Sequence, residues 1–155
     1  MADVSSSSAY GGARAPAGTN NAAMPQPAID VWNRPFWDAC AEGRLTFQRC
    51  KATGKAWYPP SPVSPYDLRA EWEWEDSAGQ GTIVSWVVFH QKYFAGFADR
   101  LPYNVAIVRL DEGFSILSNI AAPNDTIRIG QRVSLAFEQR GNVNVPIFLP
   151  MEPGA

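Results

Sequence analysis

The sequence has 155 residues, of which 46% are hydrophobic, and a formal net charge of −2 at pH 7. This length is sufficient for one domain with an ordinary apolar core. The slightly acidic balance excludes a general electrostatic attraction to nucleic acid or to an anionic membrane surface, so any site for a polyanion has to be local.

The chain contains two cysteines, Cys40 and Cys50, which are too few for a secreted disulfide framework. Its N-terminus lacks the apolar run of a signal peptide, and no apolar run approaches the roughly 20 residues that span a bilayer. We therefore expect a soluble protein in the reducing cytoplasm.

Residues 1–27 consist almost entirely of Ser, Ala, Gly, Pro and Asn, and we expect a disordered tail. The following segment, residues 28–44, contains "VWNRPFWDACAEGR", which predicts a short helix. Asn33 is suited to cap it, Pro35 fits its first turn and Gly43 its end. Cys40 falls on the apolar side of this helix, which indicates a buried and unreactive thiol.

Short alternating or apolar runs separated by turn residues follow, and they predict a mainly β fold. The tight "LDEGF" connection predicts a hairpin in which Gly113 adopts a positive φ. The expected strands are Leu45 to Arg49, Glu71 to Glu75, Thr82 to His90, Tyr103 to Leu110, Phe114 to Ile120 and Arg132 to Gln139. Strands of this number and length indicate a compact antiparallel β-barrel.

Six motifs occur in a recognisable order: "PFWDACAEGRLTFQRC", "WYPPSPVSPYD", "GQGTIVSWVVFH", "LPYNVAIVRLDEGFSILSNI", "IGQRVSLAFE" and "VPIFLP". Together they resemble the bacterial and archaeal OB-fold family first catalogued as domain of unknown function 35. The resemblance implies an N-terminal helix or helical hairpin (28–44), a rubredoxin-like zinc ribbon (45–70), an OB-fold β-barrel (71–150) and a short C-terminal tail (151–155). It also implies an accessory subunit of a thiolase-type acyl-CoA enzyme.

The family places four zinc cysteines in its ribbon, and these positions correspond to Cys50, Thr53, Ser64 and Asp67. Structural zinc needs thiolate or imidazole ligands, whereas Thr and Ser hydroxyls stay protonated near neutral pH and bind zinc poorly. We therefore predict a degenerate site without metal. Trp57 and Tyr58, packing against the barrel, and the neighbouring prolines are expected to hold the segment in place of the metal; these prolines are Pro59, Pro60, Pro62 and Pro65.

Aromatic residues gather in the segment after the strand that ends at His90. Tyr93, Phe94, Phe97 and Tyr103 surround Gly96, and they either contact a partner or an apolar ligand, or cap the open end of the barrel. His90 is either an acid/base or hydrogen-bonding group near a thioester, or an ordinary residue at a strand end. The sequence offers His90 no obvious partner.

A local basic cluster consists of Arg44, Arg49, Lys51 and Lys55. These side chains either meet the phosphates of coenzyme A or an acidic patch on a partner, or are simply solvated.

The leading functional hypothesis is a non-catalytic accessory or scaffold subunit of a thiolase, acyltransferase or aldolase. No cofactor of its own is expected, although a coenzyme A thioester is a possible shared ligand. The alternatives are a single-stranded nucleic-acid-binding OB-fold, against which the acidic balance argues, and a stand-alone hydrolase or lyase using His90. The sequence leaves open the acyl group, the reaction of the partner and the stoichiometry of the hetero-oligomer.

Overall fold

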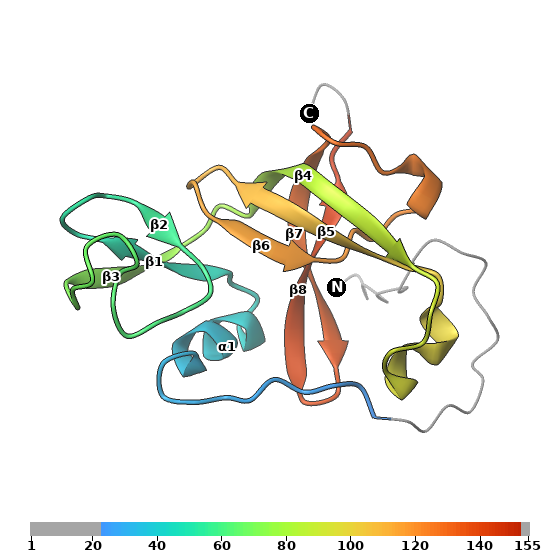
Figure 1. The fold of residues 1–155 in the computed structure, drawn as a ribbon, viewed down its shortest axis with the longest axis horizontal. Helices are drawn as coiled ribbons and strands as arrows, with labels where there is room; N and C mark the ends of the chain where they lie inside the picture. Colours follow the sequence, from blue (N-terminus) through green and yellow to red (C-terminus); the bar gives the residue numbers. More distant parts are fainter. Residues whose placement is uncertain (1–22, 153–155) are drawn as a thin grey trace, which may run out of the picture.

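The computed structural model of the protein describes residues 23–152 (Figure 1). Within this range, a small three-stranded sheet and a five-stranded barrel lie at opposite ends, with one α-helix beneath the junction. The helix has only eight residues, and no helix in the described part has the length and hydrophobicity of a transmembrane span.

The helix α1 (Arg34–Ala41) begins and ends close to where the sequence predicts. Pro35 lies in its first turn, and Gly43 follows it with a φ of 75°. Asn33 occupies the N-cap position, but its side chain makes no cap hydrogen bond. The prediction that Asn33 caps the helix is therefore wrong, because its amide bonds instead to the backbone of the preceding turn.

The first sheet is the ribbon, in which β1 (Thr46–Cys50) pairs antiparallel with both β2 (Ala56–Trp57) and β3 (Trp72–Asp76). β1 and β3 each lie within one residue of the predicted bounds. The two-residue strand β2 was not predicted, because it is too short to show an alternating pattern. Residues 58–71 form an irregular loop that returns from β2 to β3.

The second sheet has the strand order β6-β5-β4-β7-β8, and every pair in it is antiparallel. A parallel bridge between Ile120 and Phe148 joins the end of β6 to β8 and closes the barrel. The strands are β4 (Gln80–Phe89), β5 (Tyr103–Leu110), β6 (Ser115–Ser118), β7 (Arg132–Arg140) and β8 (Val143–Pro150). This is the mainly β architecture with an OB-fold barrel that the sequence predicts.

The strand β8 is absent from the predicted strands, because Pro146 and Pro150 interrupt its apolar pattern. It forms nonetheless, and Pro146 stands opposite Phe137 of β7. The hairpin between β5 and β6 follows the prediction, since Gly113 has a φ of 98°.

One apolar core runs from the ribbon into the barrel. Phe47 of β1 stacks on Phe114, the residue before β6, with ring centroids 4.7 Å apart. Phe36 of α1 lies against Tyr58 at 5.2 Å, and the Asn144 side chain of β8 donates to the Cys40 carbonyl at 2.8 Å. The helix therefore fastens the ribbon to the barrel, which explains why so short a helix is stable.

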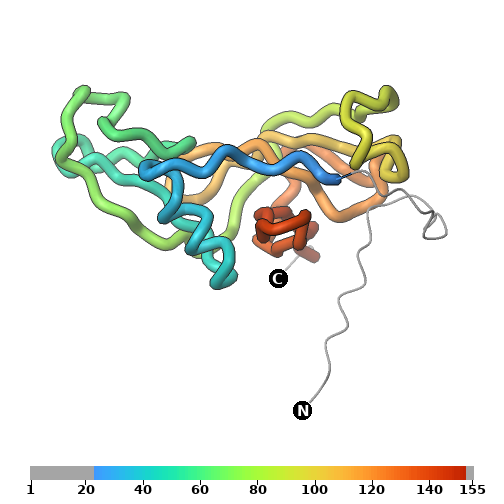
Figure 2. The backbone as a smooth tube through the Cα atoms, turned by 90° about the horizontal axis from the view of Figure 1, so that it is seen from below, coloured from blue at the N-terminus to red at the C-terminus, as the bar shows by residue number. Residues whose placement is uncertain are grey.

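The chain before the helix runs lengthwise beneath the barrel, from α1 towards the loop between β4 and β5 (Figure 2). Most of the expected tail, residues 1–22, lies outside the described residues. Its last part, residues 23–27, makes defined contacts with the barrel, which bear on the site described next.

Candidate functional site

A groove of about 330 Å³ crosses the outer face of β5 and β6. The loop of residues 90–102 forms one wall, and the turn between β7 and β8 lies at the other side. On OB-folds this face, between the first and fourth connecting loops of the barrel, is where oligonucleotides and oligosaccharides bind. The groove therefore lies on the face that usually binds ligands in OB-folds.

Aromatic side chains from the loop provide the apolar wall. Phe94, Phe97 and Tyr103 line the groove, and the Phe97 and Tyr103 rings lie 4.8 Å apart. Tyr103 also stacks on Phe89 at 5.3 Å, which fixes its ring. Tyr93 does not line the groove; it packs edge-on against Phe89 and remains 60% exposed. Three of the four predicted aromatics therefore meet at one surface.

Residues 23–28, here called the strap, cover part of this groove. Pro25 and Pro27 line it, and Gln26 between them donates to the Arg140 carbonyl at 3.1 Å and accepts from the Asn142 N–H at 3.1 Å. The strap also passes so close to Gly96 that a Cβ there would lie 2.8 Å from the Ala23 carbonyl oxygen. A glycine is thus required at position 96 by close backbone approach.

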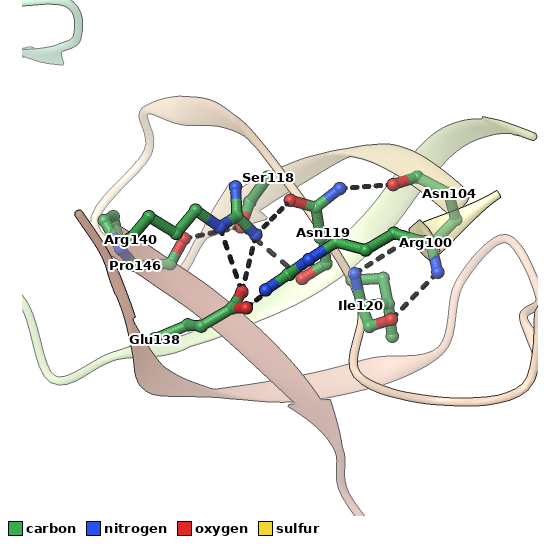
Figure 3. Close-up of polar contacts among 8 residues, drawn as sticks. All are labelled: Arg100, Asn104, Ser118, Asn119, Ile120, Glu138, Arg140 and Pro146. Carbon is green, nitrogen blue, oxygen red and sulfur yellow. Dashed lines mark hydrogen bonds and ion pairs between the residues drawn. The ribbon is translucent and has the colours of Figure 1, made fainter. Parts of the chain in front are cut away.

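Arg140 lines the groove and belongs to a network with Glu138 and Arg100 that lies behind the groove surface, here called the polar floor (Figure 3). Glu138 of β7 accepts hydrogen bonds from Arg100 of the loop and from Arg140, the latter at 2.7 Å. The Glu138 and Arg140 side chains are only about 10% exposed, and Arg140 also donates to the Asn119 Oδ1 at 2.8 Å. Because ionised groups this buried need partners, the network holds the loop and the strand β7 in one arrangement.

Asparagine side chains extend the network into the barrel. Asn104 of β5 is almost fully buried, accepts from the Ile120 N–H at 2.7 Å and donates to the Ile120 carbonyl at 2.9 Å. Asn119 donates to the Asn104 carbonyl, and Ser118 donates to the Pro146 carbonyl at 2.8 Å. Every one of these bonds ties the end of β6 to a neighbouring strand, so the groove floor is rigid.

The structure does not bring His90 into this site. His90 follows the end of β4, is exposed, and does not line the groove. Its side chain makes no hydrogen bond or ion pair with any residue between 23 and 152. No activated acid/base pair is built around it there.

The predicted basic cluster divides into two pairs. Arg44 bonds to Glu42 and to Asp76, and Arg49 bonds to Glu75 at 2.9 Å. Lys51 and Lys55 are exposed on the turn after β1, where the Lys55 ammonium lies 5.1 Å from the centre of the Tyr66 ring. The two arginines therefore stabilise the ribbon, while the two lysines stay at its surface.

The four positions of the expected zinc site do come together. The Cys50 Sγ lies 3.5 Å from the Asp67 Oδ2, and Ser64 is fully buried beside them. Hydrogen bonds from the Ser64 and Thr53 side chains lower the pKa of the Cys50 thiol, and the Arg69 backbone N–H lowers the pKa of Asp67. Hydrogen bonds thus connect these side chains to one another.

This set of donors does not fit structural zinc, because it offers one thiolate, one carboxylate and two neutral hydroxyls. Among the described residues, no group of three or more His, Cys, Asp or Glu side chains is arranged to hold a metal. We therefore assign no role to zinc in this chain.

Hydrogen bonds and rings hold the ribbon loop in the absence of a fitting metal site. The buried Gln48 donates to the Ser61 carbonyl and accepts from its N–H, at 2.9 and 2.8 Å. Trp57 lies edge-on to Tyr66 and to Trp72, with centroids 6.4 and 6.2 Å away. Trp57 therefore packs within the ribbon rather than on the barrel, and the contribution of Gln48 was not predicted.

The second cysteine, Cys40, is completely buried on the inner side of α1, as predicted. Burial raises the pKa of its thiol to about 12. At neutral pH this group is a protonated apolar side chain and not a nucleophile.

Sequence reasoning missed the polar floor and the strap. Glu138 lies in the predicted strand and Arg140 directly follows its predicted end at Gln139, so a strand one residue longer places both side chains on one face, and this spacing was the available signal. The sequence does not show that Glu138 bonds to Arg100 or that Arg140 bonds to Asn119, because these partners are 38 and 21 residues apart in the chain. It also does not show that Gln26, in the expected tail, bonds to the backbone of Arg140.

Comparison with known proteins relates both parts of the chain to one family. Residues 37–73 match the family model described as the ChsH2 rubredoxin-like zinc ribbon domain, and residues 74–138 match the ChsH2 C-terminal OB-fold domain. A "DUF35 domain-containing scaffold protein" of Methanothermobacter thermautotrophicus is 33% identical over 98 residues, which are 61% of this chain and 72% of that protein.

Two longer relatives are hydratase subunits. The "Probable enoyl-CoA hydratase alpha subunit" of Thermomonospora curvata is 35% identical over 135 residues, or 85% of this chain. The "3-oxo-4,17-pregnadiene-20-carboxyl-CoA hydratase alpha subunit" of Mycobacterium tuberculosis is 29% identical over 74% of this chain. The chain spans only 41% and 36% of the lengths of these two relatives.

Two solved structures have the same fold. A chain of the "Ltp2-ChsH2(DUF35) aldolase" superposes with a TM-score of 0.73 and 32% identity, covering 81% of this chain and 98% of that one. A DUF35 family protein of Sulfolobus solfataricus superposes with a TM-score of 0.56 at 10% identity, covering 76% of this chain and 83% of the other, which shows a shared fold alone. The chain therefore belongs to the DUF35 family, with the ChsH2-type ribbon and OB-fold and with three of the four expected zinc-cysteine positions replaced.

Proposed function

We propose that this protein is a non-catalytic accessory subunit that binds a thiolase-like acyl-CoA enzyme and shapes its access to the acyl-CoA substrate. The observation that carries the proposal is the groove with its aromatic wall. It is an apolar surface on a rigid, charge-paired floor, and Phe94 is 55% exposed at its edge. Exposed aromatics on a fixed frame are typical of surfaces that meet a partner or an apolar ligand.

The chemistry of the titratable groups supports a non-catalytic role. Both thiols of the chain are buried, and the raised pKa of Cys40 makes it unreactive. His90 is exposed and does not line the groove. A partner that brings its own nucleophile would need from this chain only a binding surface, and a coenzyme A thioester would then be a ligand shared by the two chains.

The names of the relatives favour the same hypothesis. One relative is called a scaffold protein, two are alpha subunits of acyl-CoA hydratases, and one structural neighbour comes from an aldolase named for two components. In this proposal the partner is an enzyme that acts on an acyl-CoA thioester, whether it is a thiolase-like enzyme, a hydratase or an aldolase. The acyl group itself is left open.

The nucleic-acid alternative is less well supported by the same groove. The strap lies where an oligonucleotide would stack, with Pro25 and Pro27 on the face of β5 and β6. Arg100 and Arg140 are bonded to Glu138, which reduces their attraction for phosphates. Salt-dependent binding of a single-stranded oligonucleotide at micromolar concentration would restore this alternative.

The proposal is tested by purifying the tagged chain from its native host and identifying what accompanies it. We expect a hetero-oligomer containing a thiolase-like acyl-CoA enzyme, with a mass well above the 17.0 kDa of the chain alone. Replacing Phe94→Ser should lower the turnover of acyl-CoA by that complex several-fold without dissociating it, whereas Lys92→Ala in the same loop should have no effect. Recovery of the chain as a lone monomer would contradict the proposal.

A further inference from the structure

The ribbon carries an exposed leucine in a backbone conformation that leucine disfavours. Leu68 has a φ of 59° and is the only non-glycine residue with a positive φ among residues 23–152. Its side chain is 77% exposed, so packing within this chain does not offset the backbone strain. Because no packing within the chain offsets the strain at Leu68, this conformation points to a role for the side chain in binding another molecule.

The matching turn of the ribbon shows which residue the geometry prefers. After Cys50 the chain turns back so that the Gly54 N–H donates to the Cys50 carbonyl at 2.8 Å, and Gly54 has a φ of 70°. After Ser64 the Leu68 N–H donates in the same way to the Ser64 carbonyl at 2.9 Å. The two turns are equivalent, and glycine stands in the first where leucine stands in the second.

Leu68 lies in a loop that exposes two further apolar side chains and is held rigid. Val63 and Tyr66 of the same loop are 39% and 43% exposed. The Tyr66 hydroxyl donates to the Ala56 carbonyl at 2.8 Å, and the Trp72 indole N–H donates to the Pro62 carbonyl at 3.0 Å. A loop fixed in this way loses little conformational freedom when it binds, which favours its use as a docking surface.

Cations border this surface. Lys51, Lys55 and Arg69 are exposed, and none of them forms an ion pair with another residue in the described part of the chain. The nearby Asp67 carboxylate is turned inward, where it accepts from the Arg69 N–H and from Cys50. The exposed Glu71 lies beside Lys51, whose backbone N–H donates to the Glu71 carbonyl at 3.0 Å. The surface therefore presents apolar side chains with a mainly positive rim.

We propose that Val63, Tyr66 and Leu68, here called the ribbon patch, dock into an apolar socket with acidic residues at its rim on the acyl-CoA enzyme subunit. The positive rim selects this occupant over a second copy of the chain, because a symmetric dimer would place like charges opposite each other. This inference rests on the proposed function, and it adds a second contact distant from the groove.

The test replaces Leu68→Gly and measures two quantities. Glycine relieves the strain, so the melting temperature of the isolated chain should rise by about 3 °C. The same substitution removes the most exposed apolar side chain of the patch, so the Kd for the acyl-CoA enzyme recovered with the wild-type chain should increase at least about tenfold. A merely structural role for Leu68 cannot produce this opposite pair of changes.

Further variants separate the contributions. Leu68→Asn, which tolerates a positive φ, should weaken binding similarly. Arg69→Glu should weaken binding and reduce its dependence on salt. Ile129→Gly is the matched control, because Ile129 is equally exposed at 71% and lies between η2 (Asn124–Thr126) and β7, at the far end from the ribbon; it should leave the Kd unchanged.

The outcomes distinguish this inference from the proposed function. An unchanged Kd for Leu68→Gly and Leu68→Asn, with the enzyme still bound, would overturn the ribbon patch and leave the accessory role intact. If the wild-type chain binds no acyl-CoA enzyme at all, both are overturned. A shift in the self-association of the isolated chain on replacing Leu68→Gly would instead identify a second copy as the occupant and reject the proposed one.

Discussion

Restoring the three missing cysteines should convert the ribbon into a zinc site. The change is the triple substitution Thr53→Cys, Ser64→Cys and Asp67→Cys, which together with Cys50 supplies four thiolates. We expect the variant to bind one zinc ion and the unmodified chain to bind none. The reason is that the two turns still have the geometry of a metal-binding pair, while the donor atoms do not suit zinc.

The distances in the structure allow the metal. Four sulfur atoms about 2.3 Å from a zinc ion lie about 3.8 Å from one another. The Cys50 Sγ and the Asp67 Oδ2 are 3.5 Å apart across the two turns, close to such an edge. The two turns also have the same hydrogen-bond pattern, since the Gly54 and Leu68 N–H groups each donate to the carbonyl four residues earlier, at 2.8 and 2.9 Å.

The size of the effect follows from mass action. A variant with a Kd of about 1 nM for zinc, at about 1 µM free zinc, is stabilised by about 4 kcal/mol. For a protein of this length each kcal/mol raises the melting temperature by about 2 to 4 °C, so the shift should be on the order of 10 °C. Without zinc the variant should melt below the wild type, because the hydrogen bonds of Ser64 and Asp67 are lost.

The assay combines elemental analysis after dialysis with melting curves in zinc and in chelator. The wild type should contain no zinc, and its melting temperature should be the same in both solutions. The single substitution Thr53→Cys is the control, and it should behave like the wild type. Stoichiometric zinc in the wild type would refute the assignment of a degenerate site, and a triple variant without zinc would refute the preserved geometry of the turns.

Two further predictions concern the strap and the buried thiol. Gly96→Ala should displace the strap, because its Cβ would lie 2.8 Å from the Ala23 carbonyl oxygen. Limited proteolysis should then cut the strap faster, and the free energy of unfolding should fall by about 1 to 3 kcal/mol. The control variant Lys92→Ala should behave like the wild type in both measurements. The pKa of Cys40 is raised from 9.0 to about 12, so its stabilising effect is complete below pH 9 and is lost as the pH rises towards 12. Denaturant unfolding between pH 8 and 10.5 should show stability falling as the pH rises, with up to about 1.4 kcal/mol per pH unit due to Cys40. Cys40→Ala should remove this part of the slope and leave the part due to Tyr58, whose pKa is also raised to about 12.

The barrel was predictable because its strands carry strong local patterns. In β5 the sequence shows an almost continuous apolar run, which predicts a strand, but it does not show which face is buried, since the polar Asn104 is buried and Ile107 is exposed. The turn at Gly113 is equally local. β8 was not predicted as a strand because its proline at position 146 argues against a strand until the pairing with β7 is known.

The candidate site was only half predictable, for a physical reason. Aromatic loop residues such as Phe97 are noticeable because they are unusual in a connector. The polar floor depends on contacts between distant parts of the chain, such as Arg100 with Glu138 and Arg140 with Asn119. Disorder was expected for most of the strap because its composition offers little apolar surface, yet Gln26 bonds to the turn between β7 and β8, and Pro25 and Pro27 lie on the groove.

The ribbon shows why a metal can be lost from a fold without losing the fold. A structural zinc ion stabilises small ribbons because they have almost no core of their own. Here Trp57 packs between Tyr66 and Trp72, and Gln48 makes two hydrogen bonds to the backbone of Ser61, so side-chain packing and hydrogen bonds hold the loop without a metal.

If the only role of the ribbon were to hold itself together, an exposed leucine in a left-handed turn would serve no purpose. Glycine at position 68 would fit the same turn, as Gly54 does in the other, and would make the isolated chain more stable. The ribbon instead keeps a fixed shape, an apolar side chain that its own fold does not use, and neighbouring cations without ion-pair partners in the described chain. These features are explained together if the ribbon is a docking element whose outer surface, and not its metal, carries its function.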